Sequence, residues 1–150
     1  MAMKLLSVLA GLAIVVAAPA VAQEAAPEGG AVEITADQIT GDAEAGARLF
    51  RRCQACHEVG ADAENKVGPL LTGVVGRAAA AVEGYEYSSA MQEAAEGGLV
   101  WTIEELHAFL EAPRDHVPGT KMVFPGLRDE ADRNDVIAFI YENSNGTEAN

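Results

Sequence analysis

Apolar residues recur at helical spacing in several parts of this 150-residue chain. Behind Asp42, a residue suited to cap a helix, Gly46, Leu49, Phe50 and Cys53 fall at positions i, i+3, i+4 and i+7. Residues at this spacing lie on one face of an α-helix. The pattern therefore predicts a helix whose C-terminal end carries the cysteines.

Two further helix starts are marked by capping residues. Ser89 and Gln92 fit a capping box that opens a short helix, and two consecutive glycines are expected to end it. Thr102 and Glu105 fit a second capping box and predict a longer helix that stops before Pro113.

A last helix is predicted over residues 129–143, with Val136, Phe139 and Ile140 on its apolar face. The segments between the helices are rich in Gly and Pro, which favours loops; five glycines fall between positions 60 and 84. The sequence shows no internal repeat and no convincing strand pattern. It therefore predicts an all-α fold of about three main helices plus loops.

The first 22 residues have the three parts of a secretory signal. Lys4 gives a short basic start, residues 5–18 are uncharged and mostly apolar, and Ala20 and Ala22 have the A-x-A spacing of a cleavage site. These 14 uncharged residues are short for a membrane span, which needs about 20. We expect export to the periplasm with cleavage after Ala22; retention as an N-terminal anchor is the alternative.

Three segments are expected after the signal. Residues 23–40 are rich in Ala, Glu, Gly and Pro and predict a flexible acidic lead, within which Val32 and Ile34 could pack locally. Residues 41–143 are expected to form one domain, and residues 144–150 a disordered polar tail.

The chain is strongly acidic, with a formal charge of −13. Cleavage changes this to −14, because Lys4 is lost and residues 1–22 hold no acid. Such a chain repels the phosphates of nucleic acid, which excludes binding of nucleic acid by general electrostatics.

Both cysteines lie in the segment Cys-Gln-Ala-Cys-His, where Cys53 and Cys56 are followed by His57. A thioredoxin-like redox pair is disfavoured, because no strand pattern precedes it. A zinc site would need two further ligands, and His107 and His116 lack the usual paired-histidine spacing. The motif is typical of covalent haem attachment. We therefore predict one haem c, attached through both cysteines, with His57 as an axial ligand of iron.

The second axial position decides whether the iron is open to small ligands or closed for electron transfer. Once the signal is removed, Met91 and Met122 are the only methionines. Met122 lies in a loop between Pro118 and Pro125 that can hold a side chain over a haem face, whereas Met91 fits the core of a short helix. The sequence favours Met122 as the second ligand.

Together these features resemble the class I cytochromes c, the soluble mitochondrial type and its bacterial periplasmic relatives. The resemblance runs from Gly41 to about Asn143. It is carried by Cys-Gln-Ala-Cys-His, V-G-P-L-L-T-G-V-V-G-R from Val67 to Arg77, G-Y-E-Y from Gly84 to Tyr87, Trp101, and P-G-T-K-M from Pro118 to Met122.

The resemblance implies roles for residues around the histidine. The carbonyl group of Pro69 would accept a hydrogen bond from His57, fixing the ring and raising its basicity. Gly46 and Phe139 would meet where the first and last helices cross.

The resemblance also implies roles for residues near the haem propionates and near Met122. Arg77, Tyr87 and Trp101 would surround the haem propionates, whose charges need donors when partly buried. Thr120 would orient the side of the pocket that carries Met122.

The chain departs from the family at two pocket positions. Phe109 stands where these cytochromes usually carry a tyrosine, and Met91 falls near a position that is usually asparagine. Both changes would remove polar groups from the methionine side of the pocket. Their effects on the reduction potential oppose one another, so the sign of the shift does not follow from the sequence.

The larger departure is in charge. The mitochondrial carrier presents a ring of lysines to acidic partners, whereas here only Lys66 and Lys121 occupy the matching loops, with Arg51, Arg52 and Arg77 nearby. We hypothesise docking through a small apolar patch at the haem edge, with modest dependence on salt.

The resemblance implies a soluble, monomeric electron-transport protein of a respiratory or photosynthetic chain, and not an enzyme. A cytochrome bc-type complex would be the electron donor, and a terminal oxidase, nitrogen-oxide reductase or photosynthetic reaction centre the acceptor. Two alternatives stay open: a peroxidase or gas-binding protein whose Met122 dissociates, and a haem module tethered through its N-terminus to a larger complex.

Overall fold

The computed structural model describes residues 30–145 and is all-α, as predicted. The described range holds no strand, and one isolated antiparallel bridge joins Ala78 to Val100. No helix in this range is long and apolar enough to span a membrane. The expected cleavage site after Ala22 lies outside the described residues. The elements in order are η1 (Ala36–Gln38), α1 (Ala43–Phe50), α2 (Ser89–Glu96), α3 (Ile103–Glu111), α4 (Pro113–His116) and α5 (Glu130–Asn145).

Helix α1 begins where the sequence predicts. The side chain of Asp42 accepts a hydrogen bond from the backbone N–H of Ala45 at 3.0 Å, which satisfies one of the free donors of the first turn. The helix ends at Phe50, earlier than expected, and residues 51–56 form consecutive turns. The cysteines therefore follow α1 and are not part of it.

The capping box predicted from Ser89 is wrong by one residue. Ser88 caps α2, because its backbone is extended and its hydroxyl accepts from the N–H of Met91 at 3.1 Å. At α3 the hydroxyl of Thr102 accepts from the N–H of Glu105 at 3.2 Å, as predicted. The Glu105 carboxylate instead pairs with His116 of α4 at 2.7 Å.

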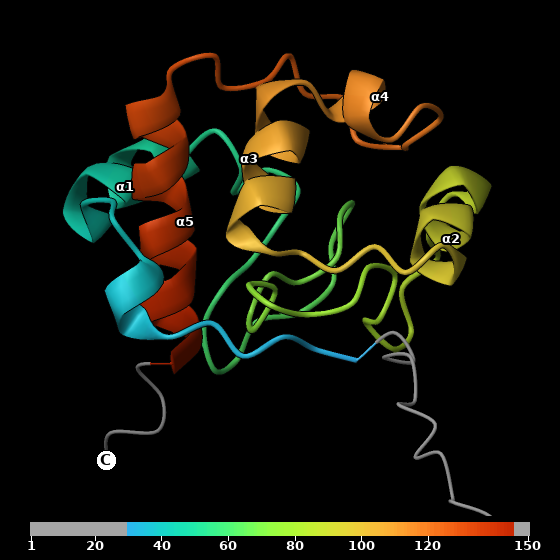
Figure 1. Cartoon of the computed structure of the whole chain (residues 1–150), viewed down its shortest axis with the longest axis horizontal. Coiled ribbons are helices and arrows are strands. Elements are labelled where there is room, and N and C mark those ends of the chain that lie inside the picture. Colours follow the sequence, from blue (N-terminus) through green and yellow to red (C-terminus); the bar gives the residue numbers. More distant parts are fainter. Residues whose placement is uncertain (1–29, 146–150) are drawn as a thin grey trace, which may run out of the picture.

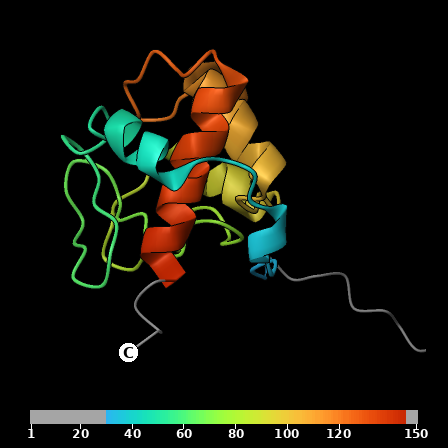
Figure 2. The same ribbon diagram turned by 90° about the vertical axis from the view of Figure 1, so that its left-hand side faces the viewer.

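Helices α1 and α5 cross in close contact (Figures 1 and 2). Gly46 is buried at the crossing, where a Cβ atom would collide with the backbone carbonyl of Asp135. The rings of Phe50 and Phe139 lie 5.0 Å apart beside it. The predicted meeting of Gly46 and Phe139 is thus present in the fold, and glycine is needed because the two backbones approach so closely.

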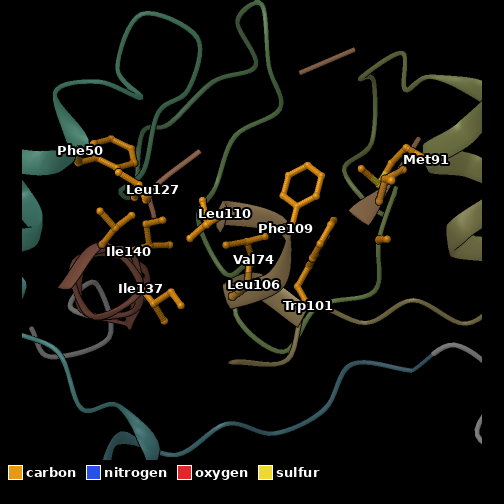
Figure 3. Close-up of a cluster of buried hydrophobic side chains, with 13 residues drawn as sticks. Phe50, Val74, Met91, Trp101, Leu106, Phe109, Leu110, Leu127, Ile137 and Ile140 are labelled. Carbon is orange, nitrogen blue, oxygen red and sulfur yellow. The ribbon is translucent and has the colours of Figure 1, made fainter. Parts of the chain in front are cut away.

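The core connects this crossing to α3 and α2 (Figure 3). Trp101 and Phe109 pack with their rings 4.9 Å apart, while Ile137 and Ile140 project from α5. The buried apolar residues are Phe50, Val74, Ala79, Met91, Trp101, Leu106, Phe109, Leu110, Val117, Leu127, Val136, Ile137, Ala138 and Ile140.

A buried arginine fastens α5 to its neighbours. Arg133 is 7% exposed and donates to the carbonyl groups of Leu127 at 2.7 Å and Arg128 at 2.9 Å. Its Nε donates to Nδ1 of His107 in α3 at 3.1 Å, and His107 Nε2 lies 2.9 Å from Oδ1 of Asn134. The arginine thus replaces water as the donor to buried carbonyl groups.

The two ends of the domain differ from expectation. Residues 30–40, predicted as part of a flexible lead, pack along the domain; we call this segment the strap. In Figure 1 it runs, in blue, beneath the loops and crosses the lower end of α5. Val32, Ile34 and Ile39 carry its apolar side chains, and Ile39 packs against the core. Helix α5 continues to Asn145, two residues beyond the boundary expected at 143.

Candidate functional site

One cavity collects every site residue that the sequence predicts. It is lined by Cys53, Cys56, His57, Pro69, Arg77, Tyr87, Trp101, Thr120 and Met122. These residues come from the segment after α1, the glycine-rich loop, the segments before α2 and α3, and the loop after α4. Residues far apart in the chain therefore line one cavity.

The turns after α1 hold the two cysteines. The backbone N–H of Cys53 donates to the carbonyl of Phe50 at 2.7 Å, and those of Cys56 and His57 both donate to the carbonyl of Cys53 at 2.9 Å. Both thiols are free and partly buried. Burial raises the pKa of Cys53, while Arg52 acts in the opposite direction.

His57 is held by the loop that follows. Its Nδ1 lies 2.7 Å from the carbonyl oxygen of Pro69, so Nδ1 donates this hydrogen bond in the neutral ring. Gly68 lies directly against the ring, and a Cβ atom at that position would collide with it. Burial lowers the pKa of His57, and the bond to Pro69 acts in the opposite direction. A neutral imidazole with a free Nε2 is the form that binds a metal.

Arg77 places a guanidinium group at the cavity, and one of its hydrogen-bond donors has no acceptor among the described residues. Nη1 donates to the carbonyl of Thr72 at 2.8 Å and Nη2 to that of Leu70 at 3.3 Å. In the described part of the chain, Nε of Arg77 is the one buried side-chain nitrogen or oxygen without a partner. Burial lowers the pKa of Arg77. A buried donor on a cation needs an acceptor, and an anionic group would supply it.

Tyr87 and Trp101 lie near this arginine. The hydroxyl oxygen of Tyr87 accepts from the N–H of Val82 at 3.3 Å, and burial raises its pKa. The backbone N–H of Trp101 donates to the carbonyl of Arg77 at 2.8 Å. Both side chains line the cavity together with Arg77.

The methionine side of the cavity is apolar. The hydroxyl of Thr120 accepts from the backbone N–H of Met122 at 3.3 Å, which fixes the turn that carries this side chain. Met91 and Phe109 are buried and also line the cavity. Both positions where the sequence departs from the family therefore face the cavity, and both present carbon or sulfur there in place of an amide or a hydroxyl.

Other wall residues were expected only as core. Their signal in the sequence was the apolar helix face, which does not distinguish a wall facing a cofactor from one facing another helix. They include Leu106, Leu110, Val136 and Ile140. Leu71 and Val74 of the glycine-rich loop also line the cavity, and no helix face marks them in the sequence. His107 and His116 lie elsewhere, in the contacts described above. Within residues 30–145 no three His, Cys, Asp or Glu side chains are grouped so that they could hold a metal ion.

These residues fit a covalently bound haem. Cys53 and Cys56 can form the two thioethers, and His57 and Met122 supply a nitrogen and a sulfur of the kinds that ligate haem iron. The unpartnered Nε of Arg77 suits a haem carboxylate, and the apolar walls suit a flat aromatic ring.

The cavity mouth carries exposed apolar side chains and paired charges. Val67 is 78% exposed and Val123 is 82% exposed, and both line the cavity. Lys66 pairs with Glu58 at 2.7 Å, and Lys121 pairs with Glu86 at 3.7 Å. The two lysines predicted at this edge therefore each have a carboxylate within ion-pair distance.

The chain was compared with known proteins. The profile of the cytochrome c family matches residues 43–144. Cytochrome c2 of Agrobacterium tumefaciens (strain II Chrys) is 45% identical over 100 residues, covering 67% of this chain and 90% of that protein. Cytochrome c-550 of Nitrobacter winogradskyi is 45% identical over 100 residues, covering 67% and 89%. The solved structure of cytochrome c2 from Rhodospirillum Centenum matches with a TM-score of 0.66 at 41% identity, covering 69% of this chain and 99% of that one.

Proposed function

The chain belongs to the cytochrome c family of electron carriers, which hold haem c through a Cys-x-x-Cys-His motif, and from this membership we propose that it is a periplasmic one-electron carrier with His57 and Met122 as axial ligands. The haem supplies an iron that changes its charge by one electron. The observation that carries the ligand assignment is the presence of both side chains in the cavity that the cysteines also line.

The protein's own residues would keep both redox states closely similar. The Pro69 carbonyl holds the His57 ring through Nδ1, which leaves Nε2 to face the iron. The Thr120 hydroxyl holds the Met122 backbone. A thioether is a soft ligand that favours ferrous iron and so raises the reduction potential. With both ligands held by such bonds, electron transfer requires little rearrangement.

We assign the docking face to the cavity mouth around Val67 and Val123, which we call the rim patch. Desolvation of these two exposed valines favours association, whereas the paired lysines contribute little net charge. The partners that suit this face are redox proteins of a respiratory or photosynthetic chain. We propose a cytochrome bc-type donor and, as acceptor, a terminal oxidase, nitrogen-oxide reductase or photosynthetic reaction centre. An apolar contact surface on each partner is expected.

Optical spectroscopy of the mature haem protein tests the ligand assignment. The oxidised protein is expected to show the sulfur-to-iron charge-transfer band, and the reduced protein is expected not to bind carbon monoxide. The variant Met122→Leu should lose the band and bind carbon monoxide. Met91→Leu is the matched control, because it alters the only other methionine of the mature chain, and it should keep the band.

Other outcomes would contradict the proposal. If the unmodified protein lacks the band and binds carbon monoxide, the iron is open and a peroxidase or gas-binding function replaces electron transfer. If the band disappears in Met91→Leu and persists in Met122→Leu, the sixth ligand is misassigned. Recovery of the protein only with membranes, with residues 1–22 intact, would favour a tethered haem module.

A further inference from the structure

The strap, residues 30–40, lies outside the region that matches the cytochrome c family, which begins at residue 43. It nevertheless contacts two parts of the domain that are far apart in the sequence. The backbone N–H of Val32 donates to the carbonyl of Gly76 at 2.6 Å. The hydroxyl of Tyr141 in α5 donates to the carbonyl of Ile34 at 3.1 Å. The strap thus bridges the last helix and the glycine-rich loop.

Gly76 is shaped to receive the strap. It has a positive φ of 84°, and a Cβ atom there would collide with the Val32 carbonyl oxygen and lie 3.2 Å from Cγ1 of Ile34. The strap therefore covers the Cα of Gly76 directly, and Gly76 is buried. Only a residue without a side chain allows this contact.

The covered glycine precedes the arginine of the cavity. The N–H of Gly76 donates to the carbonyl of Trp101 at 2.8 Å, and the N–H of Trp101 donates to the carbonyl of Arg77 at 2.8 Å. The hydrogen bond from Val32 to the Gly76 carbonyl adds the strap to this series of backbone hydrogen bonds. Backbone motion at Gly76 would therefore move both Arg77 and Trp101.

We propose that the strap is a positioning segment that fixes the Gly76–Arg77 backbone and thereby aims the Arg77 guanidinium at the acidic groups of the haem. This inference rests on the proposed function for the identity of those groups. Val32 supplies the hydrogen bond, Ile34 covers Gly76, and Tyr141 anchors the strap to α5. A fixed cation beside the cofactor favours the reduced state, because it offsets negative charge there.

The variant Val32→Pro tests the proposal, since proline has no N–H to donate to Gly76. Ala31→Pro is the matched control, placing the same residue in the strap one position earlier. In the reduced haem protein, hydrogen exchange of the Gly76 and Trp101 amides is expected to be about tenfold faster in Val32→Pro. The amide of Leu106 in α3 serves as an internal reference and should be unchanged. Ala31→Pro should resemble the unmodified protein.

The reduction potential distinguishes positioning from simple stabilisation. It should be lower in Val32→Pro than in Ala31→Pro. In an Arg77→Lys background, Val32→Pro should cause a much smaller further decrease, because both changes act on the same cation. If exchange at Leu106 also rises in Val32→Pro, the milder Tyr141→Phe is used, and the same local increase in exchange and decrease in potential are expected.

Unchanged exchange at Gly76 and Trp101 would overturn the proposal. Faster exchange with an unchanged potential, or an equal decrease of the potential in the Arg77→Lys background, would also overturn it. These outcomes are separable from failure of the proposed function, because amide exchange does not depend on which side chain is the sixth ligand. That failure would instead appear as the missing charge-transfer band.

Discussion

The imidazole Nδ1 of His57 lies 2.7 Å from the carbonyl oxygen of Pro69, and Gly68 between them in sequence lies against the same ring. The loop thus controls the histidine in two ways. The carbonyl group sets its hydrogen bond, and the missing side chain of Gly68 leaves space for its plane. Both features fix which nitrogen faces the cavity.

Substitution by alanine should have different effects at Gly68 and at Pro69. Pro69→Ala keeps the carbonyl oxygen, so the reduction potential should change little. Gly68→Ala adds a Cβ atom that collides with the ring and weakens the hydrogen bond. A less basic ligand disfavours ferric iron, so we expect a higher potential.

A redox titration of both variants checks this expectation, with the charge-transfer band recorded first to establish that Met122 ligation persists. Equal potentials in Gly68→Ala and the unmodified protein would show that the ring tolerates the added carbon and that the loop does not set the ligand's basicity.

Gly46→Ala should strongly destabilise the protein. The added Cβ atom would collide with the Asp135 carbonyl, which belongs to the backbone of α5 and cannot rotate away. We expect a loss of about 3 kcal/mol in the free energy of unfolding, measured with urea. Gly97→Ala is the control, because its nearest non-neighbouring atom would be 3.3 Å away and its φ is −73°. A loss under about 1 kcal/mol in Gly46→Ala would mean that the helices can separate without cost.

Much of the site could be predicted because its signals are local in sequence. The cysteine–histidine motif, the caps at Asp42 and Thr102, and the proline-bracketed Met122 loop each fit within a few residues. The family resemblance supplied Pro69, Arg77, Tyr87, Trp101 and Thr120, and it implied that they surround one haem pocket.

The strap and the arginine network were not predicted, because both depend on contacts between distant segments. The alternation of Val32 and Ile34 indicated that this segment could pack locally. Nothing in the nearby sequence shows that it packs against Gly76. Arg133 precedes Val136, Ile137 and Ile140 at helical spacing, which places a charge on the buried face of α5. That placement could have indicated a buried arginine, but not its acceptors.

Arg133→Met should therefore destabilise the protein although methionine is apolar. It would leave the carbonyl groups of Leu127 and Arg128 and the Nδ1 atom of His107 without their donor. We expect a loss of about 3 kcal/mol in urea unfolding. Arg128→Met removes the same charge at an exposed neighbour and should change stability by less than about 0.5 kcal/mol. Similar losses in both variants would contradict a special role for the buried guanidinium.

The paired lysines at the cavity mouth give the last prediction, which concerns charge at the docking face. Hydrogen bonding to Lys66 lowers the pKa of Glu58, so this carboxylate stays ionised from pH 5 to 8 and keeps Lys66 neutralised. The rate of electron transfer from the unmodified protein should therefore depend only weakly on salt, and equally so over that pH range. As the pH falls through the lowered pKa of Glu58, the carboxylate is protonated and Lys66 loses its partner charge. The cavity mouth then becomes more positive.

Glu58→Gln unmasks Lys66 at neutral pH, and Glu86→Gln does the same for Lys121. Oxidation of the ferrous protein by ferricyanide, an anion, should become about twofold faster at low ionic strength in each variant. The difference should vanish near 1 M salt, where screening acts within about 3 Å. Glu93→Gln in α2 makes the same charge change at an exposed position outside the cavity wall and should have a smaller effect. If all three variants accelerate oxidation equally, only the net charge matters, and the local pairing of the lysines does not define the docking face.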